Sequence, residues 1–274
     1  MSQVKIGILG CQGRMGKALT MAVLDHPSTQ LEGGTEMVGH SDIGMLIKHP
    51  GNGDVTTVKI TDDAEELIKN SDVIVDFTCP TATLNHASLA VNSKTAMIIG
   101  TTGMSDSDEE FLVEVSRQIP VVYCSNYSEG VTLLLHLTTI ASAALDNDFD
   151  VEVVEMHHRD KVDAPSGTAL SIGEAAARGR NVDLKDVMVE ARHGMTGARK
   201  KGDIGFAVLR GGNVAGEHTV SFNADDERIE LTHKAGNRSI FARGAVKAAY
   251  WVNNKPSGLY TMTDVLGLNK NGLQ

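Results

Sequence analysis

The chain has 274 residues, of which 41% are hydrophobic and only 4% aromatic, and its formal net charge at pH 7 is −10. This length exceeds one average domain, so two domains are expected. The acidic balance and the few aromatic residues argue against a nucleic-acid partner, which requires a basic stripe or stacking side chains.

Targeting, membrane and metal signals are absent from the pattern. The first residues have neither a basic n-region nor an apolar h-region. No apolar run reaches the ~18 residues of a membrane span, and the nearest is interrupted at His136. Cys11, Cys79 and Cys124 are odd in number and scattered, which fits reduced thiols better than a disulfide framework or a zinc site. We expect a cytoplasmic protein with no membrane contact and no metal.

In the first half of the chain, short runs rich in β-branched residues alternate with helical patterns. Strands are expected at residues 4–9, 55–60, 73–77, 96–99 and 121–124, and helices at 14–24, 64–69, 82–92 and 108–118. This alternation predicts an α/β domain with a mostly parallel sheet covered on both faces. We expect that sheet to end near residue 128.

From about residue 150 the pattern changes to consecutive strands joined by short polar turns. Strands are expected at residues 151–156, 187–192, 204–209, 217–222 and 228–233, and helices at 168–178 and 240–252. Such an order predicts a mixed or antiparallel sheet, and hence a second domain of α+β type.

A glycine-rich run, Gly10-Cys11-Gln12-Gly13-Arg14-Met15-Gly16, follows the first strand directly and opens the first helix. Gly10 permits a tight turn, Gly13 lets the backbone approach a pyrophosphate, and Gly16 lets the helix pack closely on the strand. The helix N-terminus adds partial positive charge. Gln12 stands where the commonest fingerprint has glycine. We interpret the run as a dinucleotide-binding turn, and the alternative is an ordinary tight turn.

Glu36 lies 20 residues beyond Gly16, at the expected end of the second strand. A carboxylate there can accept hydrogen bonds from both hydroxyls of the adenosine ribose. It would also repel a 2′-phosphate, and the adjacent Met37 offers no cation in compensation. We therefore predict a preference for NADH over NADPH. The alternative for Glu36 is an ordinary surface acid.

Three further turns follow expected strands: Asp76 to Pro80, Gly100 to Gly103, and Cys124 to Ser128. Ligands bind outside the carboxyl ends of parallel strands, so these turns are candidates for cofactor contact. The last of them would place Tyr127 near the nicotinamide. The alternative for each turn taken alone is an ordinary strand-to-helix connection that binds no ligand.

The run from Glu155 to Thr168 places two imidazoles, a guanidinium and an ammonium within five residues, followed by Ser166-Gly167-Thr168. Neighbouring like charges are retained where something anionic is held. Hydroxyls and exposed backbone N–H groups complete a carboxylate site. We interpret this run as a site for a small dianionic substrate. The alternative is a strand end with solvated basic residues.

These motifs together resemble the 4-hydroxy-tetrahydrodipicolinate reductase (dihydrodipicolinate reductase) family of the bacterial diaminopimelate and lysine pathway, nearly end to end. The resemblance is carried by Gly13-Arg14-Met15-Gly16, Asp76-Phe77-Thr78, Gly100-Thr101-Thr102-Gly103, Asn126-Tyr127-Ser128, residues 155–169, Gly216-Glu217-His218-Thr219 and Thr232-His233-Lys234-Ala235. It implies hydride transfer to a cyclic dicarboxylate, which leaves an enamine that must take up a proton.

The resemblance also implies roles for individual residues. As catalytic residues, His157 resembles the residue proposed as proton donor or acceptor, and Lys161 resembles the one proposed as proton donor and substrate ligand. The positions similar to substrate ligands are His158, Ser166, Gly167 and Thr168. The positions similar to cofactor contacts are Gly10, Cys11, Gln12, Gly13, Arg14, Met15, Glu36, Gly100, Thr101, Thr102, Cys124, Ser125, Asn126 and Tyr127. The resemblance implies a nicotinamide cofactor and a homotetramer. With the charge of Glu36 taken into account, we expect that cofactor to be NADH, with NADPH possible.

The implied domains are a Rossmann-like dinucleotide-binding domain at residues 1–128 and 238–274 and a substrate-binding and tetramerisation domain at 129–237. Some family members have a basic residue where Met37 stands and an arginine where Cys79 stands. Both differences remove cations near the adenosine end, which bears on NADPH use and not on the chemistry.

Two other functions fit parts of the pattern. One is a different small-substrate dehydrogenase, acting for instance on aspartate, which explains the glycine turn but not the cation cluster. The other is a non-catalytic dinucleotide sensor. His233, Lys234 and Arg238 lie where the chain returns to the first domain, and we expect them to be structural; the alternative is that they line the cleft or set the hinge.

Overall fold

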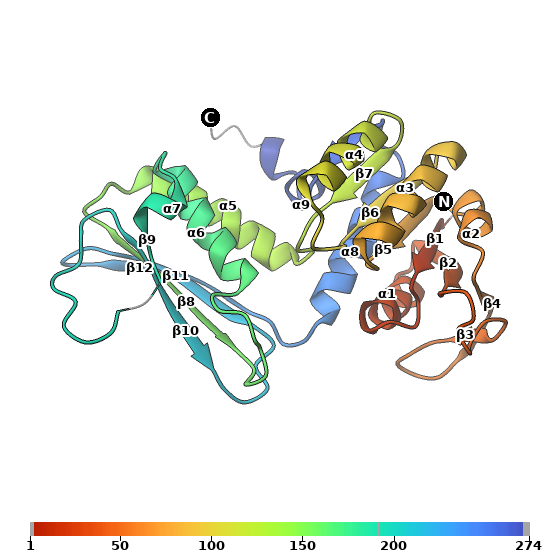
Figure 1. Cartoon of the computed structure of the whole chain (residues 1–274), viewed down its shortest axis with the longest axis horizontal. Coiled ribbons are helices and arrows are strands. Elements are labelled where there is room, and N and C mark those ends of the chain that lie inside the picture. The colour runs from red at the N-terminus through yellow and green to blue at the C-terminus, as the bar shows by residue number, and fades with distance from the viewer. Residues whose placement is uncertain (1–2, 191, 271–274) are drawn as a thin grey trace. The chain divides into compact units, whose positions relative to one another are not determined.

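The computed structural model describes residues 3–190 and 192–270 (Figure 1). The chain divides into two compact units, the first comprising Met1–Glu129 with Ser239–Gln274 and the second Gly130–Arg238. Of the ranges predicted for the two domains, residues 1–2, 191 and 271–274 lie outside the described residues. The ligand-binding roles assigned to the domains remain predictions.

In the described residues, the first unit is built on an eight-stranded sheet in the order β13-β7-β6-β5-β1-β2-β4-β3. Its strands are parallel except for β3, which pairs antiparallel with β4. Their bounds are β1 Val4–Leu9, β2 Thr29–Thr35, β3 Leu46–Lys48, β4 Val55–Thr61, β5 Val73–Asp76, β6 Ala96–Ile99, β7 Pro120–Tyr123 and β13 Gly258–Tyr260. The predicted α/β architecture with a mostly parallel, Rossmann-like sheet is confirmed.

Helices cover both faces of this sheet (Figure 1). Side chains of α1 and α8 build one apolar core with the strands, and those of α2, α3 and α4 build the other. The helices of the unit are α1 Arg14–Asp25, α2 Ala64–Asn70, α3 Pro80–Ser93, α4 Asp106–Ser116, α8 Ser239–Val252 and α9 Met262–Val265, with a 3₁₀ turn at Leu268–Lys270. The central strands are buried on both sides, which explains their uninterrupted apolar runs.

The expectation that the sheet ends near residue 128 is wrong. After α8 the chain returns and adds β13 as an edge strand beside β7, with Gly258 opposite Pro120. Three residues are too few to show the alternation that marks a strand in sequence. The pairing with β7, and not a local pattern, defines this element.

The second unit has a five-stranded sheet in the described residues, in the order β12-β11-β8-β10-β9. The central strand β8 is parallel to β10 and antiparallel to β11, so the predicted mixed sheet is confirmed. The helices α5 and α6 lie on one face of this sheet (Figure 1). The bounds are α5 Glu129–Ala144, β8 Asp150–His157, α6 Gly167–Gly179, α7 Leu184–Val187, β9 Met188–Val189, β10 Ile204–Arg210, β11 Glu217–Asn223 and β12 Arg228–Lys234.

The strand predicted at residues 187–192 is mostly wrong. Asp183 accepts a hydrogen bond from the Lys185 backbone N–H and starts the short helix α7, which takes in Val187. Only Met188–Val189 pair with β10. Ala191 lies outside the described residues. The helix α5 was not predicted, because its apolar and threonine-rich run shows no clear helical period.

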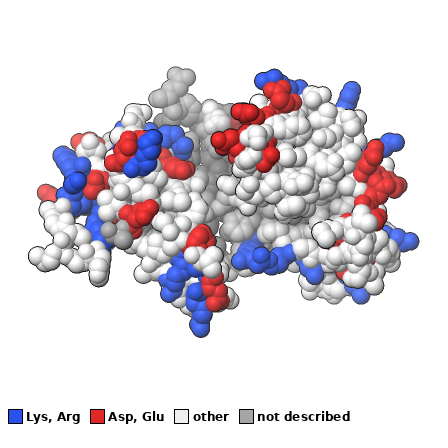
Figure 2. All heavy atoms as spheres, in the orientation of Figure 1, with Lys and Arg blue, Asp and Glu red and all other residues white. Residues whose placement is uncertain are grey.

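Among the described residues, no helix combines the length and the apolar character that a membrane crossing demands. On the face shown in Figure 2, acidic and basic side chains lie side by side in small mixed groups. That distribution is the one expected of a surface that does not track a polyanion.

Candidate functional site

The glycine turn of the first unit has the geometry that its sequence predicts. Gly10 has φ +70°, a conformation that favours glycine, and its carbonyl accepts a hydrogen bond from the Gly13 backbone N–H at 3.1 Å. A Cβ on Gly16 would lie 2.0 Å from the Gly10 carbonyl oxygen. The helix α1 can therefore pass this close to the turn only with glycine at position 16.

The first backbone N–H groups of α1 have no side-chain acceptor within the described structure. Its N-cap is Gly13, which makes no side-chain hydrogen bond, and no acidic residue lies in its first turn. The helix α4, by contrast, has a capping box formed by Ser105 and Asp108. Free N–H groups at the positive end of a helix dipole suit a phosphate, so this turn fits a dinucleotide.

Glu36 lies against the same turn. Its Oε1 accepts a hydrogen bond from the Gln12 backbone N–H at 2.6 Å, and the residue is half-buried. This hydrogen bond fixes one carboxylate oxygen of Glu36 against the turn. Met37 beside it is 77% exposed.

Three of the predicted cofactor contacts, Cys11, Thr101 and Tyr127, have buried side chains. Cys11 is buried, and burial raises the pKa of its thiol to about 12. Tyr127 lies in the core, with its hydroxyl 2.9 Å from the Ile99 carbonyl oxygen and 2.8 Å from that of Val122. These side chains therefore pack inside the unit and anchor the loops that carry them.

The buried carboxylate of Asp76 connects the loops that follow β5 and β6. It accepts hydrogen bonds from the Thr78 backbone N–H at 2.9 Å, from the Thr78 hydroxyl at 2.6 Å, and from His86 Nδ1 at 2.8 Å. The hydroxyls of Thr83 and Thr101 lie 2.8 Å apart in the same cluster. Asp76 therefore fixes two of the loops predicted to contact the cofactor.

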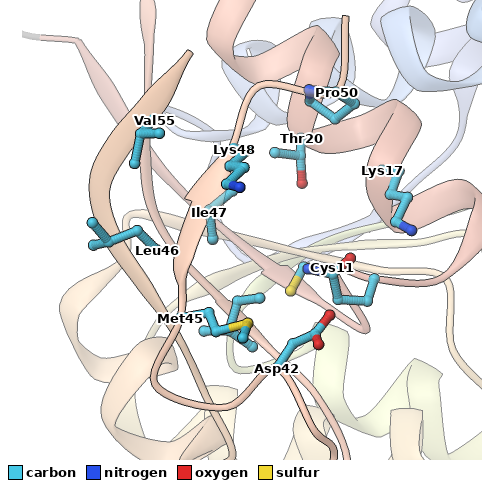
Figure 3. A pocket seen from close by; sticks show the side chains of 12 residues that line it. Cys11, Lys17, Thr20, Asp42, Met45, Leu46, Ile47, Lys48, Pro50 and Val55 are labelled. Atoms are coloured by element: carbon cyan, nitrogen blue, oxygen red, sulfur yellow. The ribbon is translucent and has the colours of Figure 1, made fainter. Parts of the chain in front are cut away.

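A pocket of about 670 Å³ borders the glycine turn (Figure 3). Its walls are mainly apolar, from Met45, Ile47 and Ile60 among others, and Lys17 and Lys48 also line it. It shares Cys11 and Gln12 with the turn. A ligand on the turn would therefore adjoin a space lined by two ammonium groups and by the Asp42 carboxylate, which the sequence pattern did not indicate.

In the second unit, strand pairing gathers five titratable side chains in register. Arg210 on β10 lies opposite His157 on β8, and His218 on β11 lies opposite Glu155 on β8. His233 on β12 lies opposite His218. The loop from residue 158 to 166 then leads into the N-terminus of α6, next to this cluster.

Glu155 is the centre of the cluster. It is 1% exposed and accepts four hydrogen bonds. Two come from Arg210 at 2.8 and 3.0 Å, one from His157 Nδ1 at 2.6 Å, and one from the Ser166 backbone N–H at 3.0 Å. Burial alone would raise the pKa of Glu155, but the hydrogen bonds from Arg210 and His157 outweigh it and lower that pKa. The carboxylate is therefore ionised and accepts only.

This arrangement orients His157. Because an ionised carboxylate cannot donate, Nδ1 of His157 carries the hydrogen toward Glu155. Nε2 then holds either a lone pair or the exchangeable proton. A Cβ on Gly216 would lie 3.0 Å from Nε2, so glycine there keeps space beside the reactive nitrogen. Glu155 therefore fixes the orientation of the His157 imidazole.

The other predicted substrate ligands occupy the loop and the start of α6. Lys161 Nζ is bound to both carboxylate oxygens of Asp163 at 2.8 Å. Ser166 is the buried N-cap of α6, and Gly167 after it is exposed, with open space where a side chain would be. Thr168 follows in the first turn, and His158 is half-buried with its backbone N–H on the Val214 carbonyl.

Sequence reasoning missed Arg210 and gave His218 no role. His218 is buried, and burial, followed by the nearby His157, lowers its pKa to about 4. Burial also lowers the pKa of His233. Lys234 pairs with Glu217 at 3.2 Å, in agreement with a structural role. Within residues 3–190 and 192–270, no group of three or more His, Cys, Asp and Glu side chains is arranged to hold a metal ion.

Comparison with known proteins gives consistent matches to both halves. A family model described as "Dihydrodipicolinate reductase, N-terminus" matches residues 4–127, and one described as "Dihydrodipicolinate reductase, C-terminus" matches residues 130–266. The 4-hydroxy-tetrahydrodipicolinate reductase of Rhodopseudomonas palustris (strain BisB5) is 50% identical, covering 98% of this chain and 99% of the relative. That of Ruegeria pomeroyi is 49% identical, covering 96% and 98%.

Among solved structures, a dipicolinate-bound dihydrodipicolinate reductase from Paenisporosarcina sp. TG-14 superposes with a TM-score of 0.76 at 23% identity, covering 96% of this chain and 98% of that one. An amine dehydrogenase from Mycobacterium smegmatis superposes with a TM-score of 0.66 at 11% identity, covering 95% of each. At these identities the superpositions show a shared fold alone.

Proposed function

The chain belongs to the dihydrodipicolinate reductase family, and we propose from this membership that it reduces the cyclic dicarboxylate 4-hydroxy-tetrahydrodipicolinate with NADH or NADPH, in lysine and diaminopimelate biosynthesis. The relatives at 49–50% identity over almost the whole chain are the observation that carries the proposal. The two alternatives, an aspartate-dehydrogenase-like enzyme and a dinucleotide sensor, have no comparable support. The cytoplasmic localisation of the protein remains a prediction.

The glycine turn and Glu36 are proposed to hold the cofactor. The free N–H groups at the start of α1 would bind the pyrophosphate, and the second oxygen of Glu36 the adenosine ribose. The loops that Asp76 connects would provide backbone contacts at residues 100–102. Once bound, the nicotinamide nucleotide supplies the hydride.

His157 is proposed as the acid that protonates the reduced ring. Its Nδ1 hydrogen is committed to Glu155, so a transferable proton must sit on Nε2, beside the space that Gly216 leaves. Arg210 in turn keeps Glu155 ionised. The triad therefore fixes the tautomer and direction of one proton donor.

The start of α6 is proposed to bind a substrate carboxylate. Gly167 leaves room for the ligand, and the backbone N–H groups at this helix end, with the Ser166 and Thr168 hydroxyls, are suitable donors. His158 and Lys161 are proposed as further carboxylate ligands. Lys161 would exchange its Asp163 partner for the substrate, which restores a charge-assisted hydrogen bond in place of the one broken.

A coupled assay tests the proposed function. The preceding pathway enzyme generates the substrate in place, and NADH oxidation is followed optically. We expect oxidation that depends on both enzymes. Tight NADH binding without turnover, measured under the same conditions, would instead favour the sensor.

We expect NADH to be preferred, and Glu36→Gln to weaken that preference. The carboxylate lies where a 2′-phosphate would approach, and removing a like charge at about 4 Å relieves about 1 kcal/mol even in water, or roughly a fivefold change. Glutamine retains an oxygen for the Gln12 N–H. The measurement is kcat/KM for both cofactors. A wild-type enzyme with a clearly lower KM for NADPH would contradict the prediction.

Lys17 and Lys48 provide the matched control for this experiment. They are the cations of the pocket that adjoins the turn. If they receive a 2′-phosphate, the double variant Lys17→Ala/Lys48→Ala loses activity with NADPH and keeps it with NADH. Equal losses of activity with NADH and NADPH would show that the two lysines do not discriminate between the cofactors.

The open face of the second sheet is proposed as a tetramer interface. Val154, at the centre of this face, is 36% exposed, with Ala207 and Thr219 opposite it on the neighbouring strands. The Thr219 hydroxyl lies 2.9 Å from the hydroxyl of Thr232 on the next strand, β12. Small and β-branched side chains on an uncovered sheet face suit packing against another copy.

We expect a wild-type mass of four chains by light scattering, and a smaller assembly for Val154→Arg, since a charge at the centre of an apolar contact costs more than one at its rim. Val113→Arg is the matched control, because Val113 is 40% exposed on α4 of the first unit. A Val154→Arg protein with the wild-type mass would place the contact elsewhere.

A further inference from the structure

The side chains of Ser166 and His218 form a buried pair. The proposed chemistry uses the Ser166 hydroxyl but gives His218 no part. His218 Nε2 lies 3.0 Å from Ser166 Oγ, and Ser166 Oγ also accepts a hydrogen bond from the Ala169 backbone N–H at 3.2 Å. Both side chains are less than 5% exposed. The hydroxyl direction is therefore decided by the protein and not by solvent.

The imidazole of His218 is uncharged at neutral pH. Burial, and after it the neighbouring His157, lowers the His218 pKa to about 4, and the rings of the two histidines meet edge to face with centroids 5.1 Å apart. A neutral imidazole carries one hydrogen, on either Nε2 or Nδ1. The choice between the two nitrogens sets the role of Ser166.

The surroundings favour the hydrogen on Nε2. Nδ1 of His218 is buried, and within the described residues it has no hydrogen-bond partner. Buried N–H groups without an acceptor are rarer in proteins than buried acceptors without a donor. With the hydrogen on Nε2, only a lone pair is left without a partner.

In this tautomer, Ser166 Oγ accepts twice, from Ala169 and from His218, and both of its lone pairs are used. Its own hydrogen must then point away from both donors. We propose that His218 is a positioning residue, which directs the Ser166 hydroxyl hydrogen toward a carboxylate of the substrate at the start of α6. This inference rests on the proposed function.

The tautomer is measurable without any ligand. Long-range ¹H–¹⁵N spectra of histidine-labelled wild-type protein separate protonated from unprotonated ring nitrogens, and the spectrum of His218→Gln identifies the His218 signals. We expect Nε2 to be protonated and Nδ1 not. Protonation on Nδ1 would overturn the proposal, even if the enzyme reduces its substrate as proposed.

Substitutions at His218 test the consequence for binding. The amide nitrogen of glutamine reaches the position of Nε2, whereas that of asparagine reaches only the position of Nδ1. The probe is pyridine-2,6-dicarboxylate, titrated calorimetrically with NADH present. His218→Gln should bind it nearly as the wild type does, and His218→Asn should bind it roughly tenfold more weakly, the change for loss of one hydrogen bond to a charged group.

Further controls separate positioning from a general loss of structure. Ser166→Ala should bind as weakly as His218→Asn, and the double variant no more weakly than Ser166→Ala alone. In turnover, His218→Asn should raise the substrate KM with little change in kcat. Equal binding by the Gln and Asn variants, at matched thermal stability, would refute the assignment. A wild-type enzyme with Nε2 protonated and no turnover would refute the proposed function alone.

Discussion

Replacing His157 with glutamine should lower the turnover number by roughly 10²–10⁴, the effect typical of a lost general acid. The ion pair of Glu155 with Arg210 does not involve His157 and remains, but glutamine offers no ionisable hydrogen at the position of Nε2. Steady-state kinetics in the coupled assay measure the effect. NADH affinity should be unchanged.

His158→Gln is the matched control, since His158 is adjacent in sequence and is proposed only to bind substrate. It should raise the substrate KM and leave most of kcat. Near wild-type turnover of His157→Gln would remove the proposed acid. The same loss of kcat in both variants would show that the assay cannot separate the two roles.

Replacing Arg210 with methionine should lower the free energy of unfolding by about 3 kcal/mol. The change leaves Glu155 buried without its main cation, with only His157 and a backbone N–H to satisfy it. The value lies at the low end for a broken buried pair, because the Arg210 side chain is 20% exposed. Urea unfolding at neutral pH measures it.

The same variant has a defined pH dependence. The folded-state pKa of Glu155 is lowered, so its contribution to stability is present above its unfolded value and is lost as the pH falls through the folded value. The difference between wild type and Arg210→Met should therefore shrink in acid. A difference that is constant down to low pH would assign the loss to packing.

Arg192→Met is the control for Arg210→Met. Arg192 also forms two hydrogen bonds to a carboxylate, that of Glu152, but this pair lies nearer the surface. We expect a loss of about 1 kcal/mol or less. The double variant Glu155→Gln/Arg210→Met should be more stable than Arg210→Met, because it removes the buried charge.

Local sequence signals were sufficient for most of the fold. The uninterrupted apolar strands β5 and β6 and the capped helices α2 and α4 are visible in short windows, because their burial and capping depend on nearby residues. The edge strand β13 was missed because pairing with β7 defines it. Asp183 began a helix where a strand was expected, since one capping side chain decided between the two.

The site was predictable to the extent that it is local. The run from Glu155 to Ser166 contains His157 and its orienting carboxylate within three residues. Arg210 and His218 lie 55 and 52 residues from their hydrogen-bond partners, and only the register of β10 and β11 on β8 brings them there. No spacing in one sequence encodes that register.

A crystal structure of the protein with NADH and pyridine-2,6-dicarboxylate tests the account most directly. We predict ligand density against Nε2 of His157, with one carboxylate on the Ser166 hydroxyl and the Gly167 backbone N–H at the start of α6. A dicarboxylate bound away from His157, with Nε2 in contact only with protein atoms, would contradict it.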